Sequence, residues 1–361
     1  MTRTGSWWLP DFSKEAKCYD RLLDRGDHTL LLATGLMGEA GSVLSELKKE
    51  KRESDAYPVY RNRMHEEIGD FLWYFVRICD VVAPEIIADL PSKLTESDEA
   101  KVPPLNLFLE FGASVGDLLR ALSERQETDV PVTPLLQSVW RLLQNVAAVA
   151  NVDLSLAAQN NGLKTASRWP TEMNYVELFD KESEEEEQLP RRLQIEFKER
   201  AWGSRKFIIL RCNGINLGDR LTDNIEDPDG YRYHDIFHFA NAVYLGWSPV
   251  IRALLKCKRK SISKKDEGQD GARAMILEEA VAAIIFSRAK QLSFFDAIDH
   301  VDYDLLKTVR EFIEGFEVDV VPLWQWERSI LNGFKVFRLL RENAGGHVTL
   351  DLTNRTLSYD P

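Results

Sequence analysis

The sequence predicts a mainly α-helical protein built from two helical-bundle units, with small β-hairpins in the second half. Three observations lead to this fold class. Apolar residues recur every three or four positions through most of the first half, which is the period of an amphipathic helix. A glutamate-rich stretch in the middle of the chain ends at Pro190. Beyond it the apolar period changes from helical to two, which is typical of strands.

Five segments of the first half have the helical period: 14–47, 60–82, 104–124, 134–150 and 153–166. Pro91 and the pair Pro103-Pro104 interrupt the pattern. Pro170 marks the end of the last helix, because a residue that precedes proline is disfavoured in the helical conformation. We therefore expect a helical domain over residues 1–172. The run ESEEEE at 182–187 predicts a solvated acidic linker over residues 173–190.

The second half combines both periods. Alternation at 193–197 and an apolar run at 207–210 lead into Asn213-Gly214, a strong signal for a hairpin turn. A last alternating pair of segments flanks residues 353–355 and predicts a terminal hairpin. Helical patterns occupy three further stretches, 231–257, 271–291 and 303–340. We therefore expect a second helical domain over residues 191–361 that carries β-hairpins.

The amino-acid composition argues against several classes of partner and site. The 361 residues include 46 Lys+Arg and 58 Asp+Glu, which gives a formal net charge of −12. This balance argues against a nucleic-acid duplex or an anionic membrane as partner, although a local basic patch stays compatible with it. The four cysteines form no CxxC pair, so neither a disulfide framework nor a zinc knuckle is indicated. Because the N-terminal residues lack the apolar core of a signal peptide, and no apolar run has membrane-spanning length, we expect a cytoplasmic protein.

Acidic residues lie at the edge of an expected helix–helix interface in the first half. On a helical wheel, Glu39 falls beside the apolar stripe of its segment, and Glu67 and Asp70 fall on one margin of the next. Carboxylates at such positions are costly to desolvate unless they are paired. Two interpretations are open. The carboxylates pair with Arg61 or Arg77 or reach past the edge into water, or they bind a hard cation such as Mg²⁺, whose preferred ligands are oxygens.

Three blocks in this half carry a resemblance to a family. They are Gly35–Gly41 (GLMGEAG), His65–Tyr74 (HEEIGDFLWY), and Asn161–Lys164 (NGLK) followed by Arg168–Pro170 (RWP). In this order they resemble the MazG-like all-α nucleoside triphosphate pyrophosphohydrolases, whose signature is ExxE followed, after a spacer, by ExxD. The resemblance covers residues 30–170.

The resemblance implies a metal-dependent enzyme that hydrolyses a nucleoside or deoxynucleoside triphosphate to the monophosphate and pyrophosphate. The implied cofactor is Mg²⁺, with Mn²⁺ as a substitute. The implied roles are metal ligation by Glu39, Glu67 and Asp70, catalysis by Glu66 and Glu67, and substrate binding by Asn161, Lys164 and Arg168. Since family members build their sites between the helices of paired subunits, we expect a homodimer or an intramolecular pseudo-dimer.

The sequence departs from the family pattern at Ser42, where the second glutamate of ExxE belongs. A serine hydroxyl is a poor ligand for Mg²⁺ in comparison with a carboxylate. Glu46 does not replace that glutamate, because seven residues along a helix span about 10 Å. Either the site binds its metal with one anionic ligand fewer, or this half has lost catalysis. The alternative function is therefore a catalytically inactive nucleotide-sensing or scaffold protein that retains the fold.

The second half holds the densest cluster of metal-binding residue types. His234, Asp235 and His238 share one side of a predicted helix. On a later helix, Glu279 points into the middle of the apolar face and Glu278 lies at its margin. Asp235, His238 and Glu279 are candidate metal ligands, and the imidazole nitrogen favours Mn²⁺ or another transition metal over Mg²⁺.

A purely structural interpretation of Glu279 is also open. In that interpretation Arg273, Arg288 or a histidine holds its carboxylate across a packed interface. A comparison of the two halves favours the metal site, because aligning Asp235 with Glu39 and Glu279 with Glu67 makes the second half a diverged MazG-like unit. On this alignment a histidine stands at the position of Ser42 and an alanine at that of Asp70.

Overall fold

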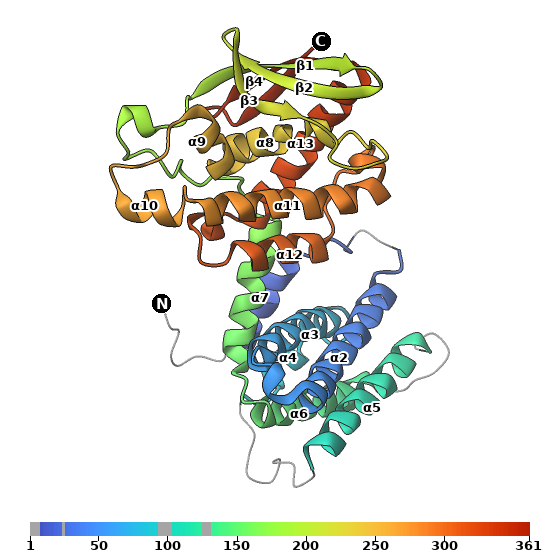
Figure 1. Ribbon diagram of the computed structural model, residues 1–361. Coiled ribbons are helices and arrows are strands. Elements are labelled where there is room, and N and C mark those ends of the chain that lie inside the picture. The colour runs from blue at the N-terminus through green and yellow to red at the C-terminus, as the bar shows by residue number, and fades with distance from the viewer. Residues whose placement is uncertain (1–7, 24–25, 93–102, 125–130) are drawn as a thin grey trace. The chain divides into compact units, whose positions relative to one another are not determined.

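The computed structural model describes residues 8–23, 26–92, 103–124 and 131–361 (Figure 1). The chain divides into two compact units, Met1–Trp169 and Pro170–Pro361. The prediction of no signal peptide rests partly on residues 1–7, which lie outside the described residues. The prediction of a mainly helical protein with β-structure in its second half is confirmed.

The described part of the first unit is entirely helical. Its elements are α1 (Leu9–Cys18), α2 (His28–Glu53), the 3₁₀ turn η1 (Ser54–Ala56), α3 (Tyr60–Val82), α4 (Ile86–Asp89), α5 (Pro104–Ser123), α6 (Val132–Val149) and α7 (Leu154–Arg168). The helices predicted at 60–82, 104–124, 134–150 and 153–166 correspond to α3, α5, α6 and α7, with ends that agree within two residues.

The single helix expected at 14–47 is instead two helices, α1 and α2. Asp20 lies in the break. Its carboxylate accepts a hydrogen bond from the backbone N–H of Leu22 at 2.8 Å and pairs with Arg77 of α3 at 2.9 Å. A side chain that binds nearby backbone in this way competes with helical hydrogen bonding, so the chain turns here. Residues 24 and 25 of the expected helix lie outside the described residues.

Helix α2 packs along α3 and α5 and buries Leu32, Leu36 and Val43 in the core of the unit. The stretch His28–Ala56 is the one helix within the described ranges that is long and apolar enough to cross a membrane by length and composition. The core helix of a soluble protein passes the same test. Burial accounts for part of this apolar composition, since 39% of the apolar window is buried while Leu30 and Met37 are exposed.

Gly69 allows α3 and α7 to approach closely. A Cβ atom at this position would lie 2.7 Å from the carbonyl oxygen of Ala157, which is backbone of α7. The same helix carries Asn161 and Lys164, and the close approach brings both side chains to Asp70, the residue after Gly69. A small residue in α3 therefore sets the position of two predicted substrate-binding groups.

The second unit is an antiparallel sheet covered on one face by helices (Figure 1). Its strands are β1 (Arg192–Trp202), β2 (Arg205–Cys212), β3 (Ile215–Leu221), β4 (Gly345–Asp351) and β5 (Thr356–Asp360). Its α-helices are α8 (Asp235–Leu245), α9 (Pro249–Leu255), α10 (Ser263–Gly268), α11 (Ala272–Gln291), α12 (Tyr303–Ile313) and α13 (Leu323–Glu342). Short 3₁₀ turns are η2 (Glu185–Glu187), η3 (Tyr231–Tyr233), η4 (Ser293–Phe295) and η5 (Glu317–Val320).

The predicted hairpins join into one five-stranded sheet with the order β3-β2-β1-β4-β5. The turn between β2 and β3 is formed by Asn213 and Gly214, with φ values of 49° and 78°, as the hairpin signal predicts. The terminal hairpin β4–β5 pairs with β1 at the register Ile195↔Val348. The apolar sides of Ile195, Phe197 and Val348 therefore form one buried face of a single sheet.

Two of the long helical stretches in this half are interrupted. In the 231–257 stretch, Gly246 adopts a φ of +69° and ends α8, and Ser248 caps α9 by accepting a hydrogen bond from the N–H of Ile251. Gly315 and Pro322 lie in the break that separates α12 from α13 in the 303–340 stretch. The helix expected at 271–291 is α11, which begins one residue later.

The acidic stretch belongs to the second unit. Its glutamates are largely exposed, as expected, but Asp180 and Leu189 on either side are buried. Asp180 accepts hydrogen bonds from the N–H of Leu189 and from Arg252 of α9, each at 2.7 Å. The structure thus differs from the prediction of a solvated linker, because a buried ion pair and an apolar side chain anchor both ends of the acidic run.

We predict that Gly69→Ala destabilises the first unit by about 1–3 kcal/mol, because the added methyl group must push α7 away from α3. Gly116→Ala in α5 is the matched control, since a Cβ there meets nothing within 4 Å. It should be neutral or stabilise by up to about 1 kcal/mol. Chemical denaturation of both variants measures the difference, and equal stabilities would show that α3 and α7 are not held by this contact.

Candidate metal centres

The three acidic residues predicted as ligands in the first unit lie together. Glu39 projects from α2, and Glu67 and Asp70 project from α3. One carboxylate oxygen from each lies within 4.8 Å of the others, and all three residues are half-buried. The helix pairing seen in the structure thus gathers the group that the sequence singled out, and its role as a metal site stays a prediction.

The electrostatics of this acid group favour a bound cation. Burial is the largest cause that raises the pKa of Glu39 to about 7, and the nearby carboxylates of Asp70 and Glu67 raise it further. Three carboxylates this close do not all ionise without a compensating positive charge. A proton on Glu39 or a divalent cation among the three oxygens would supply that charge.

Helix α7 supplies two partners to Asp70. The ammonium group of Lys164 contacts Asp70 Oδ1, and Asn161 Nδ2 donates a hydrogen bond to the same oxygen at 2.6 Å. Asn161 is 6% exposed, and its Oδ1 atom is buried without a hydrogen-bond partner in the described part of the chain. A buried amide oxygen of this kind is costly, and hard cations accept such oxygens as ligands. The residues present therefore fit Mg²⁺.

Glu66 and Arg168 lie near this group in sequence but contact other side chains. Glu66 on α3 lies 3.4 Å from Arg63 Nη1. The Arg168 guanidinium, at the end of α7, stacks over the ring of Trp169 with 4.4 Å to the ring centroid. The structure places both residues on the helices that carry the acid group, and their predicted roles in catalysis and substrate binding stay predictions.

The arginines considered as alternative partners of the acid group bind elsewhere. Arg61 Nε donates to the carbonyl of Asn151 at 3.1 Å, and Arg77 pairs with Asp20 and Asp80. Of the interpretations left open by the sequence, pairing with these two arginines is therefore not the arrangement that the structure has.

Glu46 does not take the place of the glutamate that Ser42 replaces. Its carboxylate is 2% exposed and accepts hydrogen bonds from the hydroxyl of Tyr57 and the ammonium of Lys49. The prediction from helix geometry that Glu46 lies too far along α2 agrees with these separate contacts. Ser42 itself is half-buried on α2.

In the second unit, a buried group could hold a metal ion. It consists of His234, Asp235 and His238, and one ligand atom from each lies within 4.8 Å of the others. Asp235 is the first residue of α8 and His238 follows one turn later, so both point to the same side. His238 has no exposed surface, and Asp235 is 8% exposed.

Helix α11 brings two glutamates to this group. His238 Nδ1 lies 3.0 Å from Glu278 Oε1, and His238 Nε2 lies 3.4 Å from Glu279 Oε1. His234 Nε2 lies 3.8 Å from Glu279 Oε2. Of the partners considered for Glu279, the histidines are thus the ones beside it. Of the predicted ligands, Asp235 and His238 belong to the buried group, and Glu279 approaches the two histidines from α11.

The places of the two glutamates are the reverse of those predicted. Glu278 is completely buried, whereas 45% of the Glu279 side chain is exposed. The Glu278 carboxylate accepts hydrogen bonds from Asn241, from Ser248 and from the N–H of Val250. A helical wheel registers apolar neighbours only. It does not register the donors that the start of α9 provides, and so it does not identify Glu278 as the buried member.

Burial and neighbouring carboxylates shift the pKa values of His238 and Asp235. Burial lowers the pKa of His238, but the carboxylates of Glu278 and Glu279 outweigh it and raise that pKa well above its usual range. Burial raises the pKa of Asp235. Neither ring nitrogen of His238 has a hydrogen bond of good geometry within the described residues. A fully buried imidazole held only by ion pairs is suited to bind a metal that replaces its proton.

A sequence family described as the MazG C-terminal domain matches residues 174–361, which make up nearly all of the second unit. The N-terminal half has no family assignment. No curated protein and no solved structure matches the chain. The match falls outside residues 30–170, which carry the resemblance seen in the sequence, and it begins before the acidic run, in agreement with the burial of Asp180 and Leu189.

That the second half is a diverged copy of the first stays a prediction. Each unit places acidic groups on two neighbouring helices, α2 and α3 in one and α8 and α11 in the other. The second unit also contains a five-stranded sheet that the described residues of the first unit do not have. The proposed duplication thus has a partial structural parallel in the paired helices and none in the sheet.

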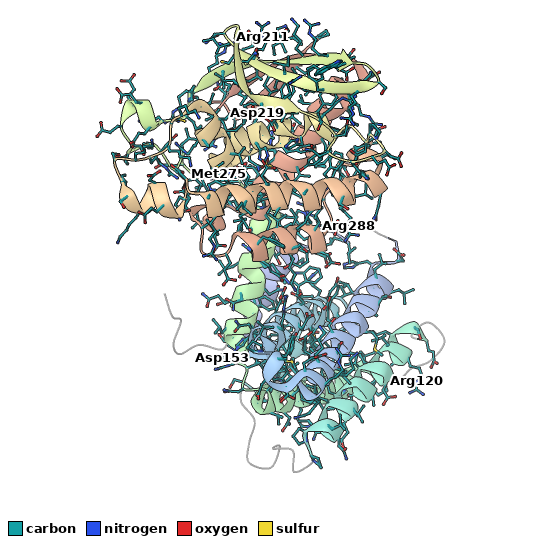
Figure 2. The ribbon with its side chains drawn as sticks, in the orientation of Figure 1. Arg120, Asp153, Arg211, Asp219, Met275 and Arg288 are labelled. Atoms are coloured by element: carbon teal, nitrogen blue, oxygen red, sulfur yellow. The ribbon has the colours of Figure 1, made fainter. Side chains whose placement is uncertain are left out.

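We predict that the group in the second unit binds Mn²⁺, and that Asp235→Asn and Glu279→Gln each weaken binding at least tenfold, because each removes an anionic ligand. Isothermal titration of the full chain measures this in an Asp70→Asn background, which suppresses binding by the first unit. Asp219→Asn, on the exposed part of β3 (Figure 2), is the control.

The structural interpretation gives a different result. If the cluster serves only to hold α8 against α11, the two variants lower the melting temperature and leave the Mn²⁺ titration of the parent chain unchanged. That outcome would show that this group of the second unit does not bind Mn²⁺.

Proposed function

The chain belongs to the MazG C-terminal domain family, and from this membership we propose that it is a metal-dependent nucleoside triphosphate pyrophosphohydrolase. Its products are a nucleoside monophosphate and pyrophosphate. The observation that carries the proposal is the acid group of Glu39, Glu67 and Asp70, with Lys164 on α7 in contact with Asp70. The three ordered sequence blocks of the first half motivate the choice of the bond that is cleaved.

The acid group provides the oxygen ligands that this chemistry needs. Glu39, Glu67 and Asp70 would hold Mg²⁺, which when bound neutralises phosphate oxygens and the charge that develops on the leaving pyrophosphate. The raised pKa of Glu39 supports a site that is completed by positive charge. Asn161 donates its amide N–H to Asp70, and its buried Oδ1 would serve as a neutral oxygen ligand.

The roles of Glu66, Lys164 and Arg168 are proposed from their positions on α3 and α7. Glu66, adjacent to the acid group on α3, accepts the proton of the water whose oxygen attacks the α-phosphorus. The bond from that phosphorus to the α–β bridging oxygen breaks, and pyrophosphate leaves with the electron pair. Lys164 and Arg168 on α7 bind the phosphate oxygens, because a cation and a guanidinium complement the charge on the triphosphate.

The proposal also covers the cellular compartment and the helices that complete the site. We propose that the protein acts in the cytoplasm and that a second pair of helices completes the site. That pair comes from a second copy of the chain or from the second unit. Light scattering of the purified protein separates a homodimer from a monomeric pseudo-dimer.

A second candidate is a nucleotide-binding protein without turnover. Ser42 favours it, because the position of a predicted carboxylate ligand carries only a hydroxyl. The contact of the Lys164 ammonium with Asp70 also favours it, because that contact already neutralises one of the three acids. This protein would bind a triphosphate and release no pyrophosphate.

We predict pyrophosphate release from at least one member of a panel of nucleoside and deoxynucleoside triphosphates in the presence of Mg²⁺ or Mn²⁺. Glu67→Gln and Asp70→Asn should each lower kcat/KM by roughly a hundredfold or more, because both keep the side-chain shape and remove the charge. The control is Glu53→Gln at the exposed end of α2. Orthophosphate and diphosphate as first products, or unchanged kinetics in both variants, would contradict the proposal.

Ser42→Glu tests the departure from the family pattern. The added carboxylate restores a fourth acid and should tighten Mg²⁺ binding by the full chain, measured by titration calorimetry. If the parent chain binds triphosphate without turnover and Ser42→Glu gains activity, the protein is the inactive relative. If Ser42→Glu leaves metal affinity unchanged, residue 42 does not face the metal.

A further inference from the structure

The sheet of the second unit has an uncovered face at the β1–β2 hairpin. Ile195 and Phe197 point to the helices and are buried, so the alternate residues of β1 point the other way. These include Lys198, Arg200 and Trp202. In the register of the hairpin, Arg200 lies opposite Phe207 and Trp202 lies opposite Arg205. One corner of the sheet thus alternates aromatic and basic side chains.

One aromatic side chain at this corner, Trp202, is largely exposed, and a second, Phe207, is half-buried. Trp202 is 76% exposed, which is unusual for the largest apolar side chain. It borders a hollow of about 530 Å³ whose lining also includes Arg205, Phe207 and Arg220. The guanidinium of Arg220, on β3, lies over the ring of Phe207 at 5.3 Å from its centroid. Two aromatic rings and guanidinium groups from two strands therefore face one open space.

The positive charge at this corner is balanced only in part by ion pairs, one of which joins Lys206 to Glu199 at 2.8 Å. Lys198 and Arg211 share the carboxylate of Glu196, at 3.5 and 3.6 Å. No ion pair within the described ranges joins Arg200, Arg205 or Arg220 to an acidic side chain. In a chain with a net charge of −12, three guanidinium groups without such an ion pair lie around one exposed and one half-buried ring and form a local basic patch of the kind that the composition left open.

We propose that this corner binds single-stranded nucleic acid. Exposed aromatic rings stack on unpaired bases, which a duplex does not offer, and guanidinium groups bind the phosphates between them. From Lys198 to Trp202 the strand covers about 13 Å, which exceeds the reach of one nucleotide. The cations are also spread over three strands, so the patch suits a short run of nucleotides better than a single one. The site uses none of the residues of the two metal centres.

The test is fluorescence anisotropy of the full chain with labelled fifteen-nucleotide oligothymidylate and oligouridylate. We expect both to bind at low salt, and the logarithm of the association constant to fall with the logarithm of the salt concentration with a slope of roughly −2, as about three phosphate contacts give. A preference between the two oligomers distinguishes DNA from RNA. A duplex of the same length should bind more weakly.

Variants locate the binding to the corner. Trp202→Ala should weaken binding at least fivefold, and the pair Arg205→Glu and Arg220→Glu at least tenfold. Phe312→Ala, at a partly exposed ring on α12, and the pair Arg273→Glu and Lys335→Glu, on exposed positions of α11 and α13, are the matched controls and should bind like the parent. All of these positions are at the surface, and circular dichroism checks that each variant is folded.

Several results would overturn the proposal. These are no binding to either oligomer at low salt, equal losses in the control variants, or a duplex that binds as tightly as the single strands. Competition by adenosine monophosphate at the same molar concentration as the oligomer would instead make the hollow a mononucleotide pocket. The binding measurement involves no turnover, so its result does not depend on whether the protein is a pyrophosphohydrolase.

Discussion

A carboxylate enclosed between packed helices requires compensating positive charge or several hydrogen-bond donors, and both units are arranged around this requirement. In the first unit, Glu39, Glu67 and Asp70 meet where α2 and α3 pack, and Lys164 approaches from α7. In the second, Glu278 has no contact with solvent and is held by donors from α8 and the start of α9. Apolar packing alone does not explain why these groups lie inside the bundles, since isolated buried charges are strongly unfavourable.

The two units meet this requirement in different ways. Glu278 is satisfied by hydrogen bonds and by the imidazole of His238, so its position is fixed within the fold itself. Glu39 has no comparable set of donors among the residues that the structure describes, and burial raises its pKa to about 7. A carboxylate left in this condition is ready to exchange a proton for a metal ion, which is a common property of functional sites. The proposed chemistry is therefore assigned to the incompletely satisfied group.

Sequence periodicity located most helices and both outer hairpins, because amphipathic patterns record which side of an element is buried. It joined α1 to α2, since the break at Asp20 depends on its ion pair with Arg77, which is distant in sequence, as well as on its local hydrogen bond to Leu22. It could not pair β4 with β1, which lie about 150 residues apart, because strand pairing leaves no local signal. The candidate ligands were found because charge on an apolar margin is visible in sequence. The reversal of Glu278 and Glu279 was not visible, because it depends on donors from another helix.

The pairing of Asp180 with Arg252 affects how this protein can be dissected and recombined. Arg252 is 2% exposed and receives its carboxylate from a residue that precedes the sheet, outside the boundary that composition suggests. A shortened chain beginning at residue 191 would leave that guanidinium buried without this carboxylate. Gene fusions or evolutionary exchanges that transfer the second unit would have to carry the preceding segment with it. The transferable unit is thus defined by an ion pair, and the end of the glutamate run belongs to it as well, because Glu187 accepts hydrogen bonds from Ser261 and from Arg252.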